Sequence, residues 1–372
     1  MTTTPRSAGR LAAVVLAVCT GYVALVALVV WLMAGPAEIG TLLGAIHPAV
    51  LPGLLGFQFL ALATQAARWR QLLRSHDPVE LPFATAAGIQ LAAVSGNVAL
   101  PLLGGDLVAS WILAHRHGVP WARSLAASLY ARLTGLITCA LLATLSALAL
   151  LGGGFSAGIG RGFAEELLAV LLFTALLLGV SLVPRPLISL GHWVERRASQ
   201  VAAPSSRRRR LGQGLMLLAW WLHTTAVRDR RWVLGAFCWS VANYLAAGSA
   251  VMLLARSLGL APSPLTCLAL VTLGSLSGMA TLIAPAGGVL EELALFALAQ
   301  QLMGAPAGTA AIFVLGYDLL RTSLVVLGVF PVIHYLRGAP SDDLASLWTR
   351  DLTPILDSLH ARAAAARAPG SP

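Results

Sequence analysis

The sequence of 372 residues contains no lysine, and charged residues of all kinds make up only 11% of it. Hydrophobic residues make up 58%, and the mean hydropathy is +0.80. No soluble core could bury so much apolar surface, so the composition excludes a soluble protein and indicates a membrane protein with several spans. All 25 basic residues are arginine and the net charge is +10, but this charge has to be assigned loop by loop before a partner is inferred.

Cysteine is also scarce, and the known catalytic motifs are missing. The four cysteines lie in apolar runs, without Cys-x-x-Cys or Cys/His spacing. We therefore expect neither a disulfide nor a metal site, and no cofactor is predicted. Hydrolase, zinc-peptidase, phosphate-loop and dinucleotide motifs are absent from the sequence. These absences predict that the protein is not an enzyme, and nucleic acid is not an expected partner.

Long apolar runs predict an all-α polytopic membrane protein with about six transmembrane helices and two re-entrant helical hairpins. The expected spans are residues 11–33, 47–67, 121–151, 163–183, 232–255 and 309–336. Together they form one transmembrane domain over residues 11–336, between a cytoplasmic N-terminus (1–10) and a cytoplasmic tail (337–372).

The only extended polar region is an Arg-rich connector over residues 184–231. Within it, the apolar segment 211–227 carries two tryptophans and arginines on both sides. Two interpretations stay open for this segment: a helix that lies at the membrane interface, or a true span.

The distribution of arginine predicts the orientation in the membrane. With both termini in the cytoplasm, all but four arginines lie on the cytoplasmic side, including the group Arg68, Arg70 and Arg74 that follows the second span. The exceptions are Arg161 and Arg256 in outside loops, and Arg132 and Arg321 within spans. Such a bias predicts a multi-pass protein of the cell inner (plasma) membrane.

Two stretches do not read as plain membrane helices. Residues 95–106 (SGNVALPLLGGD) and 277–292 (SGMATLIAPAGGVLEE) combine glycine, proline and acidic residues inside apolar sequence. Broken backbone at membrane depth is tolerated only where protein or a water-filled cavity covers it. The orientation above requires each region to enter and leave on one side. The arm 107–115, nine residues long, would cross about half a bilayer. Both regions are therefore predicted to be re-entrant hairpins.

The two hairpins belong to an internal repeat. Asp106 is followed by Gly118, which begins the tripeptide Gly-Val-Pro, and Glu292 is followed by Gly304, which begins the tripeptide Gly-Ala-Pro. The interval between the acid and the glycine is the same in both cases. A span with a central arginine follows each. The orientation makes the first repeat (about 47–151) and the second (about 232–336) inverted relative to each other, an arrangement typical of transporters.

The residue types of the hairpins suit an anion. Pro101 and Pro285 interrupt the helix, and the pairs Gly104-Gly105 and Gly287-Gly288 allow a ligand to approach the backbone. A helix that begins after such a pair presents free N–H groups to the break, as phosphate sites do. The structural alternative is that these residues only form the tight turn of a hairpin.

Arg132 and Arg321 are the sharpest candidates, because a charge in the hydrocarbon region must be paired or solvated. Each arginine either locks a hairpin to a span through a carboxylate or holds the phosphate of a substrate. Arg132 has no acid within one helical turn, whereas Asp318 lies three residues before Arg321. The predicted substrate-binding residues are Asn97, Pro101, Gly104, Gly105, Asp106, Arg132, Pro285, Gly287, Gly288, Glu291, Glu292 and Arg321.

These residues resemble a known pattern, that of the flippase-like transmembrane domain of lysylphosphatidylglycerol synthases. The matching positions are Asn97, Pro101, Gly105, Asp106, Arg132, Pro285, Gly287, Gly288, Glu291 or Glu292, and Arg321. The pattern usually has Glu at position 106, and its second motif usually has Pro at 286 and Gly at 290, where this chain has Ala286 and Leu290. The resemblance implies a stand-alone member without the aminoacyl-transferase domain, of a kind associated with lipids that include hopanoids.

Taken together, the residues and the resemblance predict translocation of a lipid whose polar or phosphate-bearing headgroup binds between the two hairpins. Two alternatives stay open: a membrane enzyme that acts on a lipid-linked substrate, and a non-transporting scaffold for a lipid-synthesis enzyme. A homo-oligomer is compatible with the sequence.

Overall fold

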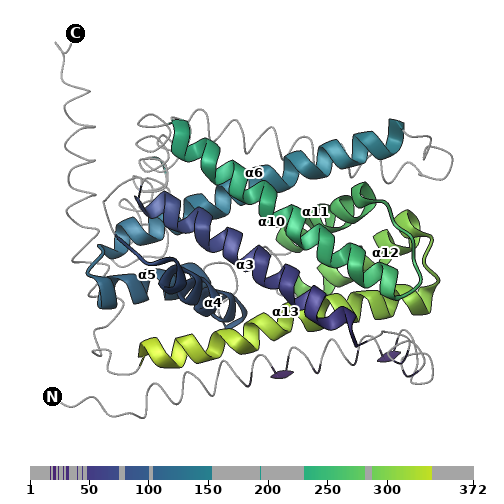
Figure 1. Ribbon diagram of the computed structural model, residues 1–372, viewed down its shortest axis with the longest axis horizontal. Helices are drawn as coiled ribbons and strands as arrows, with labels where there is room; N and C mark the ends of the chain where they lie inside the picture. The colour runs from purple at the N-terminus through teal and green to yellow at the C-terminus, as the bar shows by residue number, and fades with distance from the viewer. Residues whose placement is uncertain are drawn as a thin grey trace, which may run out of the picture.

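A computed structural model of the chain describes residues 48–74, 80–99, 104–152, 230–280 and 287–336. It also describes residue 193 and a few isolated positions before residue 48. Within these residues the secondary structure is entirely helical (Figure 1). The helices are α3 (Val50–Arg74), α4 (Phe83–Ala99), α5 (Gly104–His117), α6 (Trp121–Gly152), α10 (Arg230–Ser257), α11 (Pro264–Ala280), α12 (Gly287–Met303) and α13 (Ala307–Leu336). The all-α class predicted from the sequence is confirmed.

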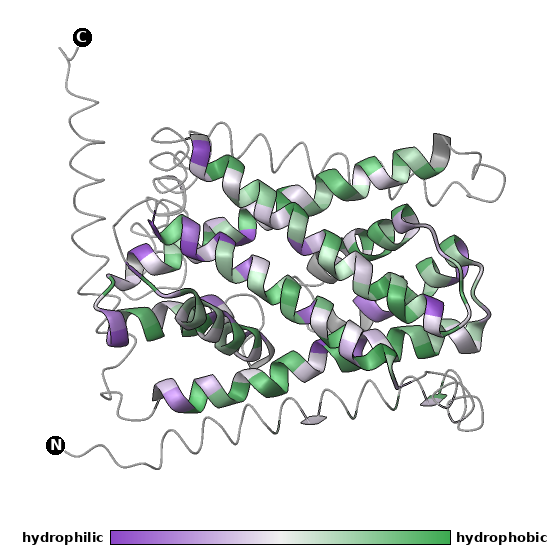
Figure 2. Cartoon of the chain, viewed as in Figure 1, coloured by the Kyte–Doolittle hydropathy of each residue, from purple (hydrophilic) through white to green (hydrophobic). Residues whose placement is uncertain are grey.

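Four of these helices are long and apolar enough to cross a membrane: α3, α6, α10 and α13. Hydrophobic residues run along most of their length (Figure 2). They confirm a polytopic membrane protein and correspond to four of the expected spans. The other two expected spans, 11–33 and 163–183, lie outside the described residues apart from isolated positions.

The remaining helices are shorter and form two pairs, α4 with α5 and α11 with α12. They contain 14 to 17 residues, or about 21 to 26 Å, which is less than the ~30 Å hydrocarbon core. The expected nine-residue arm was too short, because α5 begins at Gly104 rather than at residue 107 and ends at His117. A dipeptide of glycine opens α5 and α12 alike, where the sequence breaks the preceding helix.

The helices divide into two units with the same plan: a long helix, a short pair and a second long helix. The packing pattern is the same when the two units are exchanged. The short helix α4 of the first unit packs on α13 of the second, just as α11 of the second packs on α6 of the first, and the equivalent long helices α3 and α10 pack on each other. In Figure 1 the pair α4/α5 occupies one end of the long axis of the molecule and α11/α12 the other. The long helices α6 and α13 run between these ends.

The same turn follows each short pair. Gly118 and Gly304 have positive φ values of 64° and 63°, a conformation that glycine adopts without a steric penalty. In both turns the next residue donates its N–H back to the preceding helix at 3.3 Å: Val119 to Leu113 and Ala305 to Ala299. These turns fix a common register for the two units.

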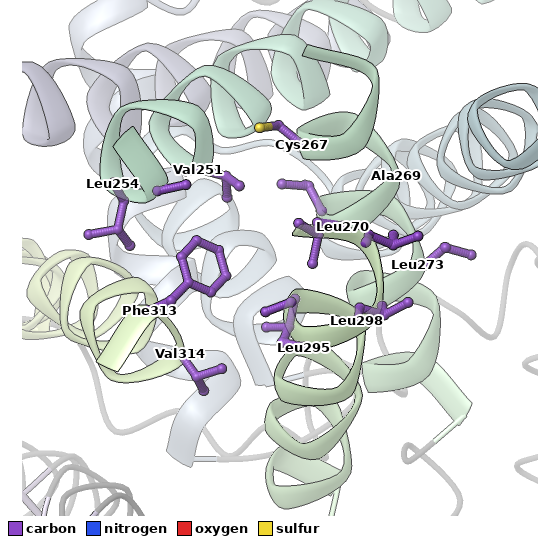
Figure 3. Close-up of a cluster of buried hydrophobic side chains, with 14 of the residues drawn as sticks. Val251, Leu254, Cys267, Ala269, Leu270, Leu273, Leu295, Leu298, Phe313 and Val314 are labelled. Atoms are coloured by element: carbon purple, nitrogen blue, oxygen red, sulfur yellow. The ribbon is translucent and has the colours of Figure 1, made fainter. Parts of the chain in front are cut away.

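Among the residues that the structure describes, the apolar core forms two main clusters, one at each short pair. The cluster around α11 and α12 surrounds the fully buried Phe313, with Leu254, Leu270 and Leu295 arriving from three other helices (Figure 3). The cluster around α4 and α5 includes the buried Trp69, whose indole N–H donates to Ser128 at 2.9 Å. Each pair therefore has a packed core of its own, which fixes the position of the polar residues beside it.

Candidate functional site

The first half of the site lies where α4 ends and α5 begins. The side-chain oxygen of Asn97 accepts a hydrogen bond from the backbone N–H of Gly105 at 3.0 Å. The first N–H groups of a helix have no partner within the helix, so Asn97 caps α5 from the other arm of the pair. The same oxygen accepts a bond from Arg132 Nη2 at 3.2 Å. Asn97 thus joins both arms to α6.

Asp106, in the first turn of α5, completes this group. Its Oδ2 lies 2.8 Å from Arg132 Nη2, and the exposed fractions of the two side chains are 14% and 31%. Arg132 has no acid within one helical turn, and the structure shows that its carboxylate partner, Asp106, comes from α5. The arrangement is a lock between hairpin and long helix in which the arginine keeps part of its surface accessible.

Glycine at the start of α5 is required by close approach of the two arms. A Cβ on Gly105 would collide with the carbonyl oxygen of Ala93 and lie 2.7 Å from the side chain of Asn97. A Cβ on Gly96 would lie 3.0 Å from the carbonyl oxygen of Gly104. Any larger residue would separate the arms and disturb the cap.

The second half of the site lies at α12 and α13. Glu291 Oε1 is 2.8 Å from Arg321 Nη1, again an ion pair between a short helix and the following long helix. Arg321 is more open than Arg132, with 52% of its side chain exposed. The neighbouring Glu292 and Asp318 are buried and interact electrostatically with each other. The adjacent residues Glu291 and Glu292 therefore have different partners, Arg321 and Asp318 respectively.

Arg68 is a site residue that the sequence analysis missed. We expected it on the cytoplasmic surface after a span, but α3 continues to Arg74 and buries Arg68 to 8% exposure. Its Nη1 donates to Ser240 of α10 at 2.8 Å, and it also interacts electrostatically with Asp106. The signal in the sequence was its spacing of four from Thr64, which places both on one buried helix face.

A partly buried tyrosine lies between the two halves. Tyr244 of α10 donates its hydroxyl to the carbonyl oxygen of Gly135 on α6 at 3.3 Å, and an added Cβ on Gly135 would contact the guanidinium of Arg68. Tyr244 also interacts with Cys139, which in turn interacts electrostatically with Glu291. Electrostatic interactions therefore relate Arg68 in the first half to Glu291 in the second.

Comparison with protein families gives one match that covers most of the chain. Residues 11–328 match the family model of the lysylphosphatidylglycerol synthase transmembrane region. The chain belongs to this family. Searches of curated proteins and of solved structures give no significant match. Membership supports a membrane protein with a lipid-related role and confirms the resemblance seen in the sequence.

Several family positions can now be placed. Asn97, Gly105, Asp106 and Arg132 lie together at the first half of the site, and Glu291 lies with Arg321 at the second. Gly104 opens α5 and Gly287-Gly288 open α12. Pro101, Pro285 and nearly all of the Arg-rich connector lie outside the described residues.

Proposed function

We propose that the protein translocates a lipid between membrane leaflets and binds its polar headgroup between the pairs α4/α5 and α11/α12. The observation that carries this proposal is the pair of ion pairs Asp106–Arg132 and Glu291–Arg321, each 2.8 Å long, on apolar helices. Ionised residues in such helices face a bundle interior or a polar cavity and mark substrate pathways.

The chemistry of the site favours a phosphate-bearing or other anionic headgroup. An arginine binds phosphate and carboxylate oxygens with the same planar donors, so a headgroup can replace a carboxylate at Arg132. The first turn of α5, with Gly104 and Gly105, adds backbone N–H groups and the positive end of the helix dipole. The acyl chains would stay in the bilayer while the headgroup crosses.

The repeated plan of the two units supports alternating access. We take the short pairs to be re-entrant hairpins of an inverted repeat, since they occupy opposite ends of the bundle and exchange with each other in the packing pattern. In transporters of this design, one repeat rocks against the other around a fixed site. The distribution of arginine supports a plasma-membrane location with both termini cytoplasmic. In this proposal the protein is a carrier and not an enzyme.

The test is lipid exchange in proteoliposomes that contain a fluorescent phosphatidylglycerol analogue. Arg132→Ala should slow exchange about 10- to 100-fold, the range that corresponds to losing one charged hydrogen bond. Arg123→Ala, at an exposed position nine residues earlier on α6, is the matched control and should retain the wild-type rate. Wild-type exchange in a correctly folded Arg132→Ala protein would remove Arg132 from the site.

A further inference from the structure

The side chains of Glu292 and Asp318 form a pair of carboxyl groups in direct contact. Glu292 on α12 is 6% exposed and Asp318 on α13 is 3% exposed, and the two buried carboxyl groups interact electrostatically across the contact between these helices. Ionised carboxylates have acceptors only, so a hydrogen bond between two of them requires one proton. Two buried carboxylates side by side repel each other, so a shared proton is the arrangement that stabilises this pair.

The common register of the two units explains where this pair comes from. Asp106 and Glu292 precede the turn glycine of their unit, Gly118 or Gly304, by the same interval in sequence. Arg132 and Asp318 likewise follow that glycine by the same interval. Glu292–Asp318 therefore occupies the positions of the ion pair Asp106–Arg132. At the position where the first unit has the guanidinium of Arg132, the second unit has the carboxyl group of Asp318. A proton on the carboxyl pair therefore takes the place of the positive charge that Arg132 supplies in the first unit.

The surroundings of the pair favour a proton that can leave. Arg321 pairs with Glu291 and also interacts electrostatically with Asp318, whose Oδ2 is buried with no hydrogen-bond partner among the described residues. Loss of the proton would leave three carboxylates beside one arginine, and their repulsion would separate α12 from α13. The other titratable neighbours are Tyr317 of α13, Cys139 of α6 and Tyr244 of α10, while the only titratable side chain of α11 is Cys267, whose charged neighbour is Arg256.

We propose that Glu292 and Asp318 form a proton-binding site that couples lipid movement to the proton gradient; the coupling rests on the proposed function. With a proton bound to one carboxylate oxygen, α12 stays packed on α13. Release of that proton to water on one side of the membrane opens the contact. Uptake of a proton from water on the other side closes the contact again, so that one proton crosses the membrane in each cycle.

Infrared spectroscopy of the purified protein tests the site without any transport. The wild type should show the C=O band of a protonated carboxylic acid, and Asp318→Asn and Glu292→Gln should each lose it, because an amide N–H donates the hydrogen bond and the remaining carboxylate needs no proton. Glu80→Gln, at an exposed position before α4, is the control and should retain the band. A wild-type spectrum without the band, or its persistence in both variants, overturns the proton site even if lipid exchange is intact.

Proteoliposomes with an imposed pH difference test the coupling. One pH unit should shift the steady-state distribution of the fluorescent phosphatidylglycerol analogue between leaflets by up to about tenfold per coupled proton, with no such shift in Asp318→Asn. The Glu80→Gln protein should respond like the wild type. A wild type that exchanges lipid but ignores the pH difference, or that follows a sodium gradient instead, overturns the coupling. A wild type that exchanges no lipid overturns the proposed function, whereas the infrared band still decides the proton site.

Discussion

The two halves of the site share one backbone plan and carry opposite charge. In the first, Asp106 lies with two arginines, Arg132 and the buried Arg68. In the second, Arg321 lies with three acids, Glu291, Glu292 and Asp318. A site with excess cationic charge suits an anionic headgroup, and one with excess carboxylate suits a proton. Two units with one helix plan thus carry chemically different sites, and in our proposal the first binds the headgroup and the second binds the proton.

The largest difference is expected when the central acid of each half is neutralised. Asp106→Asn leaves Arg132 and the buried Arg68 without their carboxylate, and an uncompensated buried arginine should cost about 3 kcal/mol. Glu291→Gln should cost much less, since Arg321 is half-exposed and the change also removes repulsion from the other two acids. Thermal unfolding in detergent measures both. Equal loss in the two variants would show that the halves are electrostatically equivalent.

The next largest effect is expected from separating α4 and α5, which approach each other closely at Gly105. Gly105→Ala places a methyl group against the backbone of Ala93 and should destabilise the protein by about 2 kcal/mol. Gly248→Ala on α10 is the matched control, since its nearest neighbour would be 3.8 Å away, an ordinary contact. The control should unfold at or slightly above the wild-type temperature, because alanine favours a helix. A tolerated Gly105→Ala would mean that the arms can separate without loss.

Much of this comparison could be predicted from the sequence. The lengths of the apolar runs predicted the long helices. The positions of the Gly-Val-Pro and Gly-Ala-Pro turns predicted the register in which Asp106 corresponds to Glu292. Pairing could not be predicted, because Glu291 and Glu292 are adjacent and point to different partners. Only the packed helices decide that Glu291 meets Arg321 and Glu292 meets Asp318.

Arg68 shows a second limit of sequence reasoning. An arginine after an apolar run normally marks the membrane surface, and nothing in the run itself says that α3 continues. Burial of Arg68 depends on Ser240 and Gly135, which lie far away in the sequence on α10 and α6. Local patterns predict elements, whereas a distant glycine that makes room for a guanidinium is visible only in the fold.

A double-mutant cycle measures the interaction energy between Arg68 and Asp106. If Arg68 and Asp106 interact, Arg68→Gln combined with Asp106→Asn should be about 1.5 kcal/mol more stable than the sum of the single changes predicts. The gain arises because the double variant leaves one fewer uncompensated cation. Thermal unfolding of the four proteins measures the coupling. Simple additivity would assign the role of Arg68 to its bond with Ser240 alone.

The smallest effect is expected at Asn97, whose oxygen joins Gly105 to Arg132. Asn97→Ala removes a helix cap and should lower stability by about 1 kcal/mol, while the ion pair Asp106–Arg132 remains. Asn97→Asp keeps the acceptor and adds a second carboxylate beside Arg132, so it should restore stability. It should also slow lipid exchange, because a headgroup then competes with two carboxylates for one arginine. Restored stability with unchanged exchange would show that Arg132 does not contact the headgroup.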